Sequence, residues 1–272
     1  MTQKLGDRMK AYENQAYSDR LMKYLPAVAR LDGKAFHTFC RGLEKPFDGN
    51  LTALMQETTK YLVKLTNACI GYTQSDEITL IWHTTDRDAQ IYFDGRVNKI
   101  VSVLASQCSV YFNEKLAEYL PEKYITVSAS GNYPVFDCRV WNVPTEMEAV
   151  NVLKWREMDA IRNSKQAVGQ ANFSHKELHG KNVDEIVELL KGRGINWDEY
   201  ADCFKRGTFI QRRDVVRPFT VDEIDKLPAQ HEARTNPSFV VNRRVYDQVR
   251  LPPLSKIINP VLVVFKGNQA EI

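Results

Sequence analysis

Apolar residues recur with helical spacing in two segments of the chain. From residue 51 to residue 65 they stand at i, i+3, i+4 and i+7, and a second series of the same kind runs from residue 97 to residue 116. This spacing lines apolar side chains along one face of a helix. The sequence therefore predicts two long amphipathic helices, each with one buried stripe.

Shorter runs with the character of β-strands lie around these helices. Ala27 to Leu31 runs into Asp32-Gly33, two β-prone runs between 68 and 83 flank a polar tip, and residues 133–143 alternate apolar and polar side chains. Such runs, bounded by turn residues, predict strands. The order strand, helix, hairpin, helix, strand is the βαββαβ plan. It predicts an α+β fold with a ferredoxin-like, polymerase-palm-like antiparallel sheet that carries its helices on one face.

The remaining segments predict additions to this core. Apolar anchors before residue 24 fit one or two amphipathic helices, and further helices fit the stretches after Pro144 and between 175 and 200. Val261 to Phe265 resembles a terminal strand in an irregular, proline-rich end. We therefore expect a palm-like catalytic domain with N-terminal helices at 1–145, and a C-terminal helical and basic-strand extension at 146–272 packed on it.

Bulk composition narrows the class of protein. The chain has 272 residues, 26% of them charged, and a net charge of +3, which is too small to argue for nucleic acid by itself. No run approaches the ~18 apolar residues that span a bilayer, and the start lacks a signal-peptide core, so a cytoplasmic protein without a membrane partner is expected. An odd number of widely spaced cysteines argues against a disulfide framework. His175 and His179 stand at i and i+4, but no third ligand suggests itself, so a metal site there is disfavoured.

Three acidic residues stand where strands end or turn. Asp32 closes the first strand, while Asp76 and Glu77 lie at or next to the hairpin tip. If the two strands are neighbours, Asp32 and Asp76 converge, and paired carboxylates on rigid strand ends can hold two Mg²⁺ ions against a nucleoside triphosphate. Solvated turn residues are the competing explanation for both stretches.

Basic residues near these acids are candidates for phosphate binding. Lys34 and His37 follow the first strand, and Lys45 supplies a further positive charge. Arg96 and Lys99 occupy the first turns of the second long helix, where cations oppose the helix dipole and favour an anionic partner. Plain solvent-facing charges remain the alternative.

A third basic group lies later in the chain. The segment 205–217 contains five positive charges against one acid, Asp214, with Phe209 among them. A basic strand pair of this type suits an RNA backbone, although a charged edge strand that resists aggregation has the same pattern. The positive residues are Lys205, Arg206, Arg212, Arg213 and Arg217.

Several of these motifs, taken together and in order, resemble the tRNA-His guanylyltransferase family. The resemblance covers residues 5 to about 215. It implies a palm-like core that adds nucleotides in the 3′-to-5′ direction to the 5′ end of tRNA, with two Mg²⁺ ions. The matching stretches are Arg30-Leu-Asp-Gly-Lys-Ala-Phe-His37, Lys45-Pro46, Tyr72-Thr-Gln-Ser-Asp-Glu77, Lys99-Ile100, Phe136-Asp-Cys-Arg-Val140, Trp155-Arg156 and Lys205-Arg-Gly-Thr208.

The resemblance also implies roles for individual residues. Asp32, Asp76 and the carbonyl group of Gly33 would bind the metal ions, and Glu77 would sit beside them as a further catalytic candidate. Lys205, Arg206, Arg212 and Arg213 are the RNA-binding candidates from the basic segment. The residues implied at the nucleotide are Asp32, Gly33, Lys34, Ala35, Phe36, His37, Lys45, Ser75, Asp76, Arg96 and Lys99.

One departure from the family pattern bears on the substrate. Eukaryotic members carry a His-Ile-Asn-Asn motif after the Trp-Arg pair, whereas this chain reads Ile161-Arg-Asn-Ser164. Asn163 matches and is retained as an RNA-binding candidate. The segments Leu178-His-Gly-Lys181, Gly194-Ile-Asn-Trp197 and Lys205-Arg-Gly207 resemble the bacterial and archaeal guanylyltransferase-like branch instead.

This resemblance favours template-dependent repair of tRNA 5′ ends, with ATP activating a 5′-monophosphate and GTP or another NTP as the added nucleotide. Addition of a guanosine to tRNA-His is the first alternative. A nucleotidyl cyclase or cyclic-dinucleotide synthase on the same palm is the second, and an RNA-binding module without catalysis is a third that the two acids disfavour. The family resemblance also suggests a homo-oligomer, possibly a tetramer.

Overall fold

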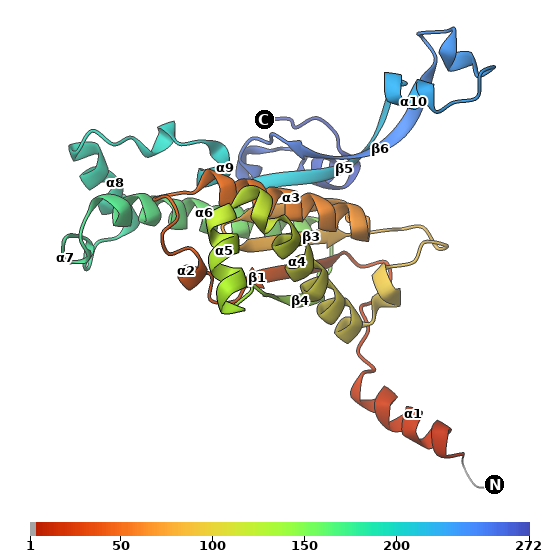
Figure 1. Ribbon diagram of the computed structural model, residues 1–272, viewed down its shortest axis with the longest axis horizontal. Coiled ribbons are helices and arrows are strands. Elements are labelled where there is room, and N and C mark those ends of the chain that lie inside the picture. The colour runs from red at the N-terminus through yellow and green to blue at the C-terminus, as the bar shows by residue number, and fades with distance from the viewer. Residues whose placement is uncertain (1–3) are drawn as a thin grey trace.

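The computed structural model describes residues 4–272. Its centre is a six-stranded sheet with the strand order β4-β1-β3-β2-β5-β6, in which every neighbouring pair is antiparallel (Figure 1). The class is therefore α+β, as predicted. The strands are β1 Ala27–Gly33, β2 Ile70–Gln74, β3 Glu77–Trp82, β4 Phe136–Asn142, β5 Thr208–Pro218 and β6 Val240–Val249.

Helices and short 3-10 turns connect these strands. Both predicted long amphipathic helices are present as α3 and α4. The α-helices are α1 Leu5–Ala16, α2 Phe36–Phe39, α3 Gly49–Thr66, α4 Val97–Tyr119, α5 Pro121–Ser130, α6 Glu146–Asn172, α7 His175–Leu178, α8 Val183–Gly192, α9 Asp202–Lys205, α10 Val221–Asp225 and α11 Pro260–Lys266. The 3-10 turns are η1 Tyr92–Gly95, η2 Trp197–Glu199, η3 Glu232–Arg234 and η4 Leu254–Lys256.

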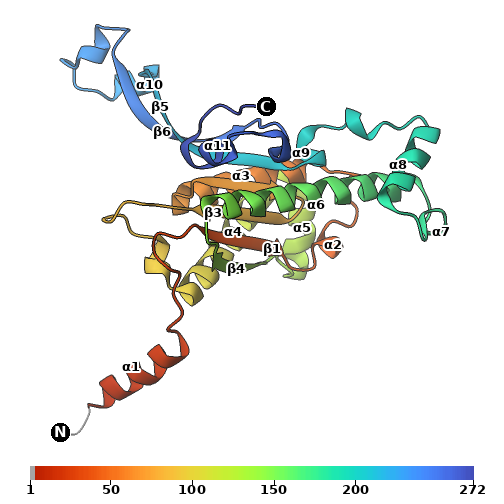
Figure 2. The same cartoon turned by 180° about the vertical axis from the view of Figure 1, so that it is seen from behind.

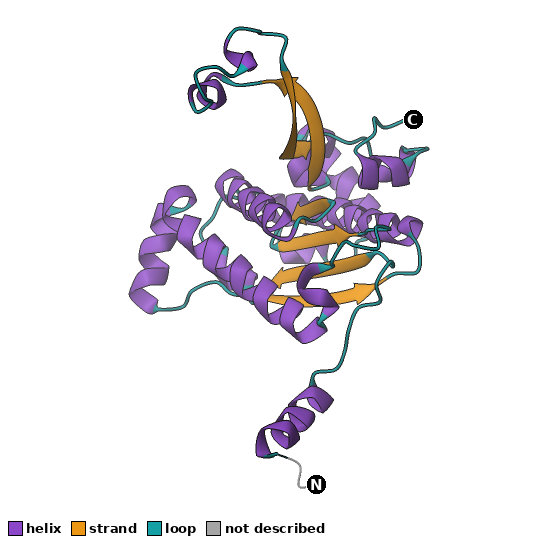
Figure 3. Cartoon of the chain, turned by 90° about the vertical axis from the view of Figure 1, so that its right-hand side faces the viewer, coloured by secondary structure: helices purple, strands orange, loops and turns teal. Residues whose placement is uncertain are grey.

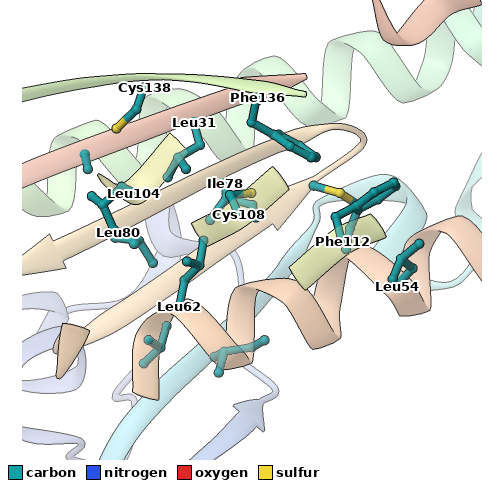
Figure 4. Close-up of a cluster of buried hydrophobic side chains, with 14 of the residues drawn as sticks. Leu31, Leu54, Leu62, Ile78, Leu80, Leu104, Cys108, Phe112, Phe136 and Cys138 are labelled. Carbon is teal, nitrogen blue, oxygen red and sulfur yellow. The ribbon is translucent and has the colours of Figure 1, made fainter. Parts of the chain in front are cut away.

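The main core lies between the sheet and the helices α3 and α4. Alternate strand residues such as Leu31, Ile78 and Leu80 face Leu62 and Phe112 from these helices, and all five are fully buried (Figure 4). This follows from the period-two alternation of a strand and the single apolar stripe of each helix.

The two helices between the predicted strands, α3 and α4, share one face of the sheet, and the opposite face is covered by α6 and α11 from residues 146–272. Val28, Ile81 and Tyr72 form a second core with Leu153 of α6 and Val263 of α11. Figure 1 views the α3 and α4 side, and Figure 2 shows α6 and α11 from behind. The inner strands carry apolar residues on both faces, which is the pattern of strands buried on both sides.

The end of the chain is a helix, which corrects the expected strand at Val261 to Phe265. Pro260 occupies the first turn of α11, and Gly267 ends it with a left-handed φ of 71°. A proline at the start and a glycine after the end are the usual helix boundaries. A short apolar run cannot distinguish the two structures by periodicity alone.

Two segments project from the body. The outer halves of β5 and β6 form a two-stranded ribbon with α10 at its tip, and α1 extends from the other side (Figures 1 and 3). Residues 4–24 hold one helix, α1, while residues 1–3 of the predicted N-terminal helical region lie outside the described residues. Among residues 4–272, no helix combines the length and the apolar character that a membrane crossing requires.

Candidate functional site

Asp32 and Asp76 meet at one end of the sheet. β1 and β3 are antiparallel neighbours with Asp32 opposite Glu77, and the backbone amide of Gly33 donates to the carbonyl oxygen of Asp76 at 3.2 Å. The hairpin turns through Ser75, whose φ of 54° lies in the left-handed region. The strand end and the hairpin tip therefore bring both carboxyl groups to one place.

The surroundings of Asp76 disfavour its charged form. Burial raises the pKa of its carboxyl group, and the negative charge of Asp32 acts in the same direction. The Ser75 hydroxyl group donates to Oδ1 of Asp76 at 3.0 Å and opposes this rise in pKa without cancelling it. A cation shared by the two carboxylates would stabilise the ionised pair.

Glu77, in contrast, has a cation of its own. Arg156 of α6 donates to its two carboxylate oxygens at 2.6 and 2.7 Å, and these side chains are only 13% and 14% exposed. Burial raises the pKa of Glu77, and Arg156 opposes the rise. Arg156 also donates to Asp159 at 3.2 Å, which ties the hairpin tip to α6. This geometry suits a positioning role for Glu77 rather than the catalytic role expected from sequence.

A cavity of about 460 Å³ opens beside the two aspartates. Its walls come from β1, the hairpin tip, the segment 43–48, α6 and α9. Phe47 stacks on Phe204 with ring centroids 5.0 Å apart, which closes one side. The lining residues that carry chemistry are Asp32, Cys40, Glu44, Lys45, Asp48, Gln74, Ser75, Asp76, Glu77, Arg156, Asp159, Asn163, Ser164 and Cys203.

The segment after Asp32 turns sharply. A Cβ atom on Gly33 would lie 2.2 Å from the ring of Phe36, so glycine allows this ring to fold back into the core. Ala35 takes a left-handed φ of 55° before α2. Phe36 is buried, whereas Lys34 and His37 are exposed. Phe36 can therefore serve a nucleotide only through its backbone, while Lys34 and His37 lie outside the residues that line the cavity.

The structure does not bring Arg96 and Lys99 to the aspartates. They lie at the start of α4, where Tyr92 packs on Trp82 at the far end of β3 with ring centroids 6.5 Å apart. The ammonium group of Lys99 lies 4.9 Å from the centroid of the Phe93 ring. These two residues are therefore not positioned to contact the same triphosphate as Asp76 within one chain, contrary to the expectation from sequence.

Lys205 and Arg206, at the C-terminal end of α9, donate hydrogen bonds to other groups of the protein. Lys205 donates to the carbonyl oxygen of Asp198 at 2.7 Å. Arg206 pairs with Glu157 at 2.8 Å and with Asp202 at 3.0 Å. Glu157 is 2% exposed, so its charge needs this arginine. Glu157 therefore neutralises Arg206 inside the fold, while Lys205 has the exposed carboxylate of Asp202 at 3.5 Å.

Arg212 and Arg213 lie on β5, and their side chains also contact other parts of the protein. Arg212 donates to the carbonyl oxygen of Asn67 at 2.7 Å. The side chain of Arg213 packs against Gly267, and its Nε atom is buried with no hydrogen-bond partner among residues 4–272. The segment is a single strand, paired with β2 and β6, rather than the strand pair predicted from its sequence. The segment therefore offers less positive charge to an RNA backbone than its sequence suggested.

Replacing Arg206 with alanine should destabilise the fold rather than only weaken RNA binding. The change leaves the buried carboxylate of Glu157 with a single donor, the amide of Leu254 at 2.8 Å. Loss of one member of a buried pair costs about 3 kcal/mol. Urea unfolding measures the loss, and Arg244→Ala, in an exposed pair with Asp214, is the control that should change little. Equal stability of both variants would contradict this assignment.

The family model described as "tRNAHis guanylyltransferase" matches residues 6–144. The chain belongs to the tRNAHis guanylyltransferase family. This family consists of nucleotidyltransferases, so the resemblance and the enzyme class expected from the sequence are confirmed.

Two curated relatives and two solved structures give the range of similarity. An uncharacterised protein of Acanthamoeba polyphaga mimivirus is 30% identical and covers 77% of each chain. The tRNA(His) guanylyltransferase of Saccharomyces cerevisiae is 28% identical, over 74% of this chain and 88% of its own. A bacterial tRNA(His) guanylyltransferase-like protein in complex with ATP has a TM-score of 0.70 and 37% identity, over 77% of this chain and 87% of its own. A bacterial protein of the same description in complex with GTP has a TM-score of 0.63 and 35% identity, over 77% and 86%.

The donor set at the family's expected metal site fits Mg²⁺ shared with a nucleotide. Among residues 4–272, no group of three or more His, Cys, Asp or Glu side chains is arranged to hold a metal. Two carboxylates and a carbonyl group leave at least half of an octahedral shell open. Mg²⁺ characteristically fills such a shell with water and substrate phosphate oxygens. Asp32, Asp76 and Gly33 would therefore hold the ions only together with a triphosphate.

Sequence reasoning missed part of the site. Arg156 belonged to a motif that carried the resemblance, but nothing in the sequence indicated that it pairs with Glu77, 79 residues earlier. Asp159, Cys40 and the Phe47–Phe204 pair carried no recognisable signal. Their positions depend on how α6 and α9 dock on the sheet, which no local pattern specifies.

Proposed function

We propose that this member of the family adds nucleotides in the 3′-to-5′ direction to the 5′ end of tRNA and thereby repairs truncated ends. The observation that carries the proposal is the pair Asp32 and Asp76. Both line one cavity large enough for a nucleotide, where a bound cation would neutralise their negative charge. The similarity to bacterial guanylyltransferase-like proteins, one with ATP and one with GTP, supports the choice of repair.

The finer fold assignment belongs to the same proposal. The strand order β4-β1-β3-β2 with α3 and α4 on one face supports a ferredoxin-like palm, to which β5 and β6 add two strands. Residues 1–145 would form the catalytic domain, and residues 146–272 would brace it through Arg156. An oligomer, possibly a tetramer, is proposed from the family resemblance alone.

The reaction would take two steps at one site. A phosphate oxygen of the tRNA 5′-monophosphate attacks the α-phosphorus of ATP, and pyrophosphate leaves. The 3′-hydroxyl group of the incoming NTP then attacks the 5′-phosphorus of the tRNA, and AMP leaves. Two Mg²⁺ ions at Asp32 and Asp76 would neutralise phosphoryl charge and lower the pKa of the attacking hydroxyl group.

The chain's own residues would hold and orient the nucleotide. Lys45 and Ser75 line the cavity beside Asp76 and would contact the triphosphate. Within residues 4–272, the backbone amides of Ala35, Phe36 and His37 have no protein acceptor, which leaves them available to phosphate oxygens. Asn163 lines the same cavity, where it donates to Asp159 at 3.2 Å, and is retained as a contact to RNA.

The test gives the purified protein a tRNA that lacks its first nucleotide, with ATP, Mg²⁺ and each NTP in turn. We expect incorporation only of the base complementary to the opposite strand. Incorporation of G regardless of that base would replace repair with tRNA-His guanylylation. A parallel incubation with labelled GTP and no RNA should yield no cyclic product, and a cyclic product would favour the cyclase alternative.

A further inference from the structure

Part of the sheet beside the two aspartates is open to solvent. On β4, Asp137 and Arg139 point to the same side of the sheet as α6, and their side chains are 56% and 53% exposed. Figure 2 shows α6 crossing the sheet, with β1 and β4 beyond one of its sides. We call the surface formed by Arg30, Asp32, Asp137 and Arg139 the open face. It lies next to the cavity, and of these four residues only Asp32 also lines the cavity.

Two arginines lie side by side here, Arg139 with 53% of its side chain exposed and Arg30 with only 19%. Arg30 of β1 and Arg139 of β4 are directly opposite in register. Like charges in this relation destabilise a sheet unless something neutralises them. Asp137 lies 3.5 Å from Arg139 in an exposed pair, and Glu77 lies 4.0 Å from Arg30 but is already held at two points by Arg156. The arginine pair thus has capacity left for an anion.

A large aromatic side chain stands beside Arg30. Trp155 of α6 is 52% exposed, although a tryptophan in a core would be buried. The guanidinium carbon of Arg30 lies 5.6 Å from its ring centroid, and that of Arg156 lies 4.6 Å from it. Two guanidinium groups fix the ring while half of its surface remains in water. An indole held in this way beside basic residues is the type of surface on which nucleic-acid bases stack.

The spacing relates this surface to the aspartates. Arg30 precedes Asp32 by two residues, so both side chains leave the same face of β1, with Cα atoms about 7 Å apart at the usual strand rise. A phosphate group at Arg30 and Arg139 would therefore lie next to the carboxylates. The cavity, with Lys45 and Ser75, already provides for a free triphosphate, so the open face would admit the other reactant.

We infer that Trp155 is a stacking platform for the 5′-terminal base of the RNA acceptor, whose 5′-phosphate then faces Arg30 and Arg139 beside Asp32. This inference rests on the proposed function, since it names where the RNA end of that reaction binds. The outer face of the terminal base of a stem is uncovered, so the ring stacks on it whether or not the base is paired. Every base presents such a face, so binding through Trp155 tolerates any terminal nucleotide.

The test places 2-aminopurine at the 5′-terminal position of an acceptor-stem RNA and follows its fluorescence as protein is added. Stacking on Trp155 should quench the signal. Trp155→Ala should abolish the quenching and weaken RNA binding about 10-fold, while Trp155→Phe retains both to within about threefold. Tyr12→Ala, at an exposed aromatic of α1, is the matched control and should behave as the unmodified protein. ATP binding, measured separately by calorimetry, should be unchanged in all variants.

Two results would overturn the inference. One is full quenching with Trp155→Ala, and the other is absence of quenching with the unmodified protein when it binds the RNA. The fluorescence signal needs no turnover, so it separates this inference from the proposed function. Quenching that depends on Trp155, without nucleotide addition to any tRNA, would refute the function and retain the platform.

Discussion

Replacing Asp76 with asparagine is expected to reduce nucleotide addition about 1000-fold or more, since the loss of a metal-binding carboxylate removes several kcal/mol of transition-state stabilisation. The change keeps the shape of the side chain and its contact with Ser75. Asp32→Asn should have the same effect, because both carboxylates serve one site. Single-turnover extension of a truncated tRNA, with saturating ATP and Mg²⁺, measures the loss.

The stability of the Asp76→Asn variant provides the control for folding. In the presence of a chelator its Tm should equal or exceed that of the unmodified protein, because the substitution removes a charge that burial and Asp32 both disfavour. Mg²⁺ with a non-hydrolysable ATP analogue should raise the Tm of the unmodified protein and not that of the variant. A folded Asp76→Asn protein with full activity would refute the metal assignment.

Because the pKa of Asp76 is raised, the stability of the metal-free protein should depend on pH in a definite direction. The folded protein holds this proton to a higher pH than the unfolded chain, whose carboxyl group keeps the ordinary value of 3.8. Ionisation of Asp76 therefore lowers stability as pH rises from about 4 through the raised pKa, and the loss is complete above it. The slope over this range should disappear in Asp76→Asn.

Local patterns were enough to predict the centre of the fold. The stripes of α3 and α4 and the strands around Asp32 and Asp76 follow from periodicity and turn residues, and each covers fewer than 25 residues of sequence. The convergence of the two aspartates followed from one added assumption, that β1 and β3 are neighbours, and the sheet register satisfies it.

The sequence could not predict what depends on docking between distant segments. Nothing near Val240–Val249 indicates that this stretch pairs with β5 to extend the sheet. The charge of Arg206 is evident from the sequence, but its buried partner Glu157 lies 49 residues earlier on α6 and becomes a neighbour only in the folded chain. Charge counts therefore overestimated the basic surface, because the buried carboxylate of Glu157 neutralises part of it.

Replacing Arg156 with alanine should both destabilise the fold and reduce activity. The change leaves the carboxylate of Glu77, only 13% exposed, with Arg30 at 4.0 Å as its remaining cation. Breaking a pair of this kind costs about 3 kcal/mol. The hairpin tip that carries Asp76 then loses its connection to α6, so nucleotide addition should fall even under conditions where the variant is fully folded.

The pH dependence distinguishes this explanation from a general loss of packing. Burial raises the pKa of Glu77, and Arg156 opposes the rise, so its removal lets the pKa increase further. Protonated Glu77 needs no cation, and the Arg156→Ala variant should therefore recover stability as pH falls from 8 toward about 5, relative to the unmodified protein. Adding Glu77→Gln to Arg156→Ala should restore most of the stability at pH 8, since no buried charge is then left unpaired. Urea unfolding of the two variants at both pH values measures these effects, and a loss in Arg156→Ala that neither low pH nor the second substitution reduces would indicate packing rather than charge.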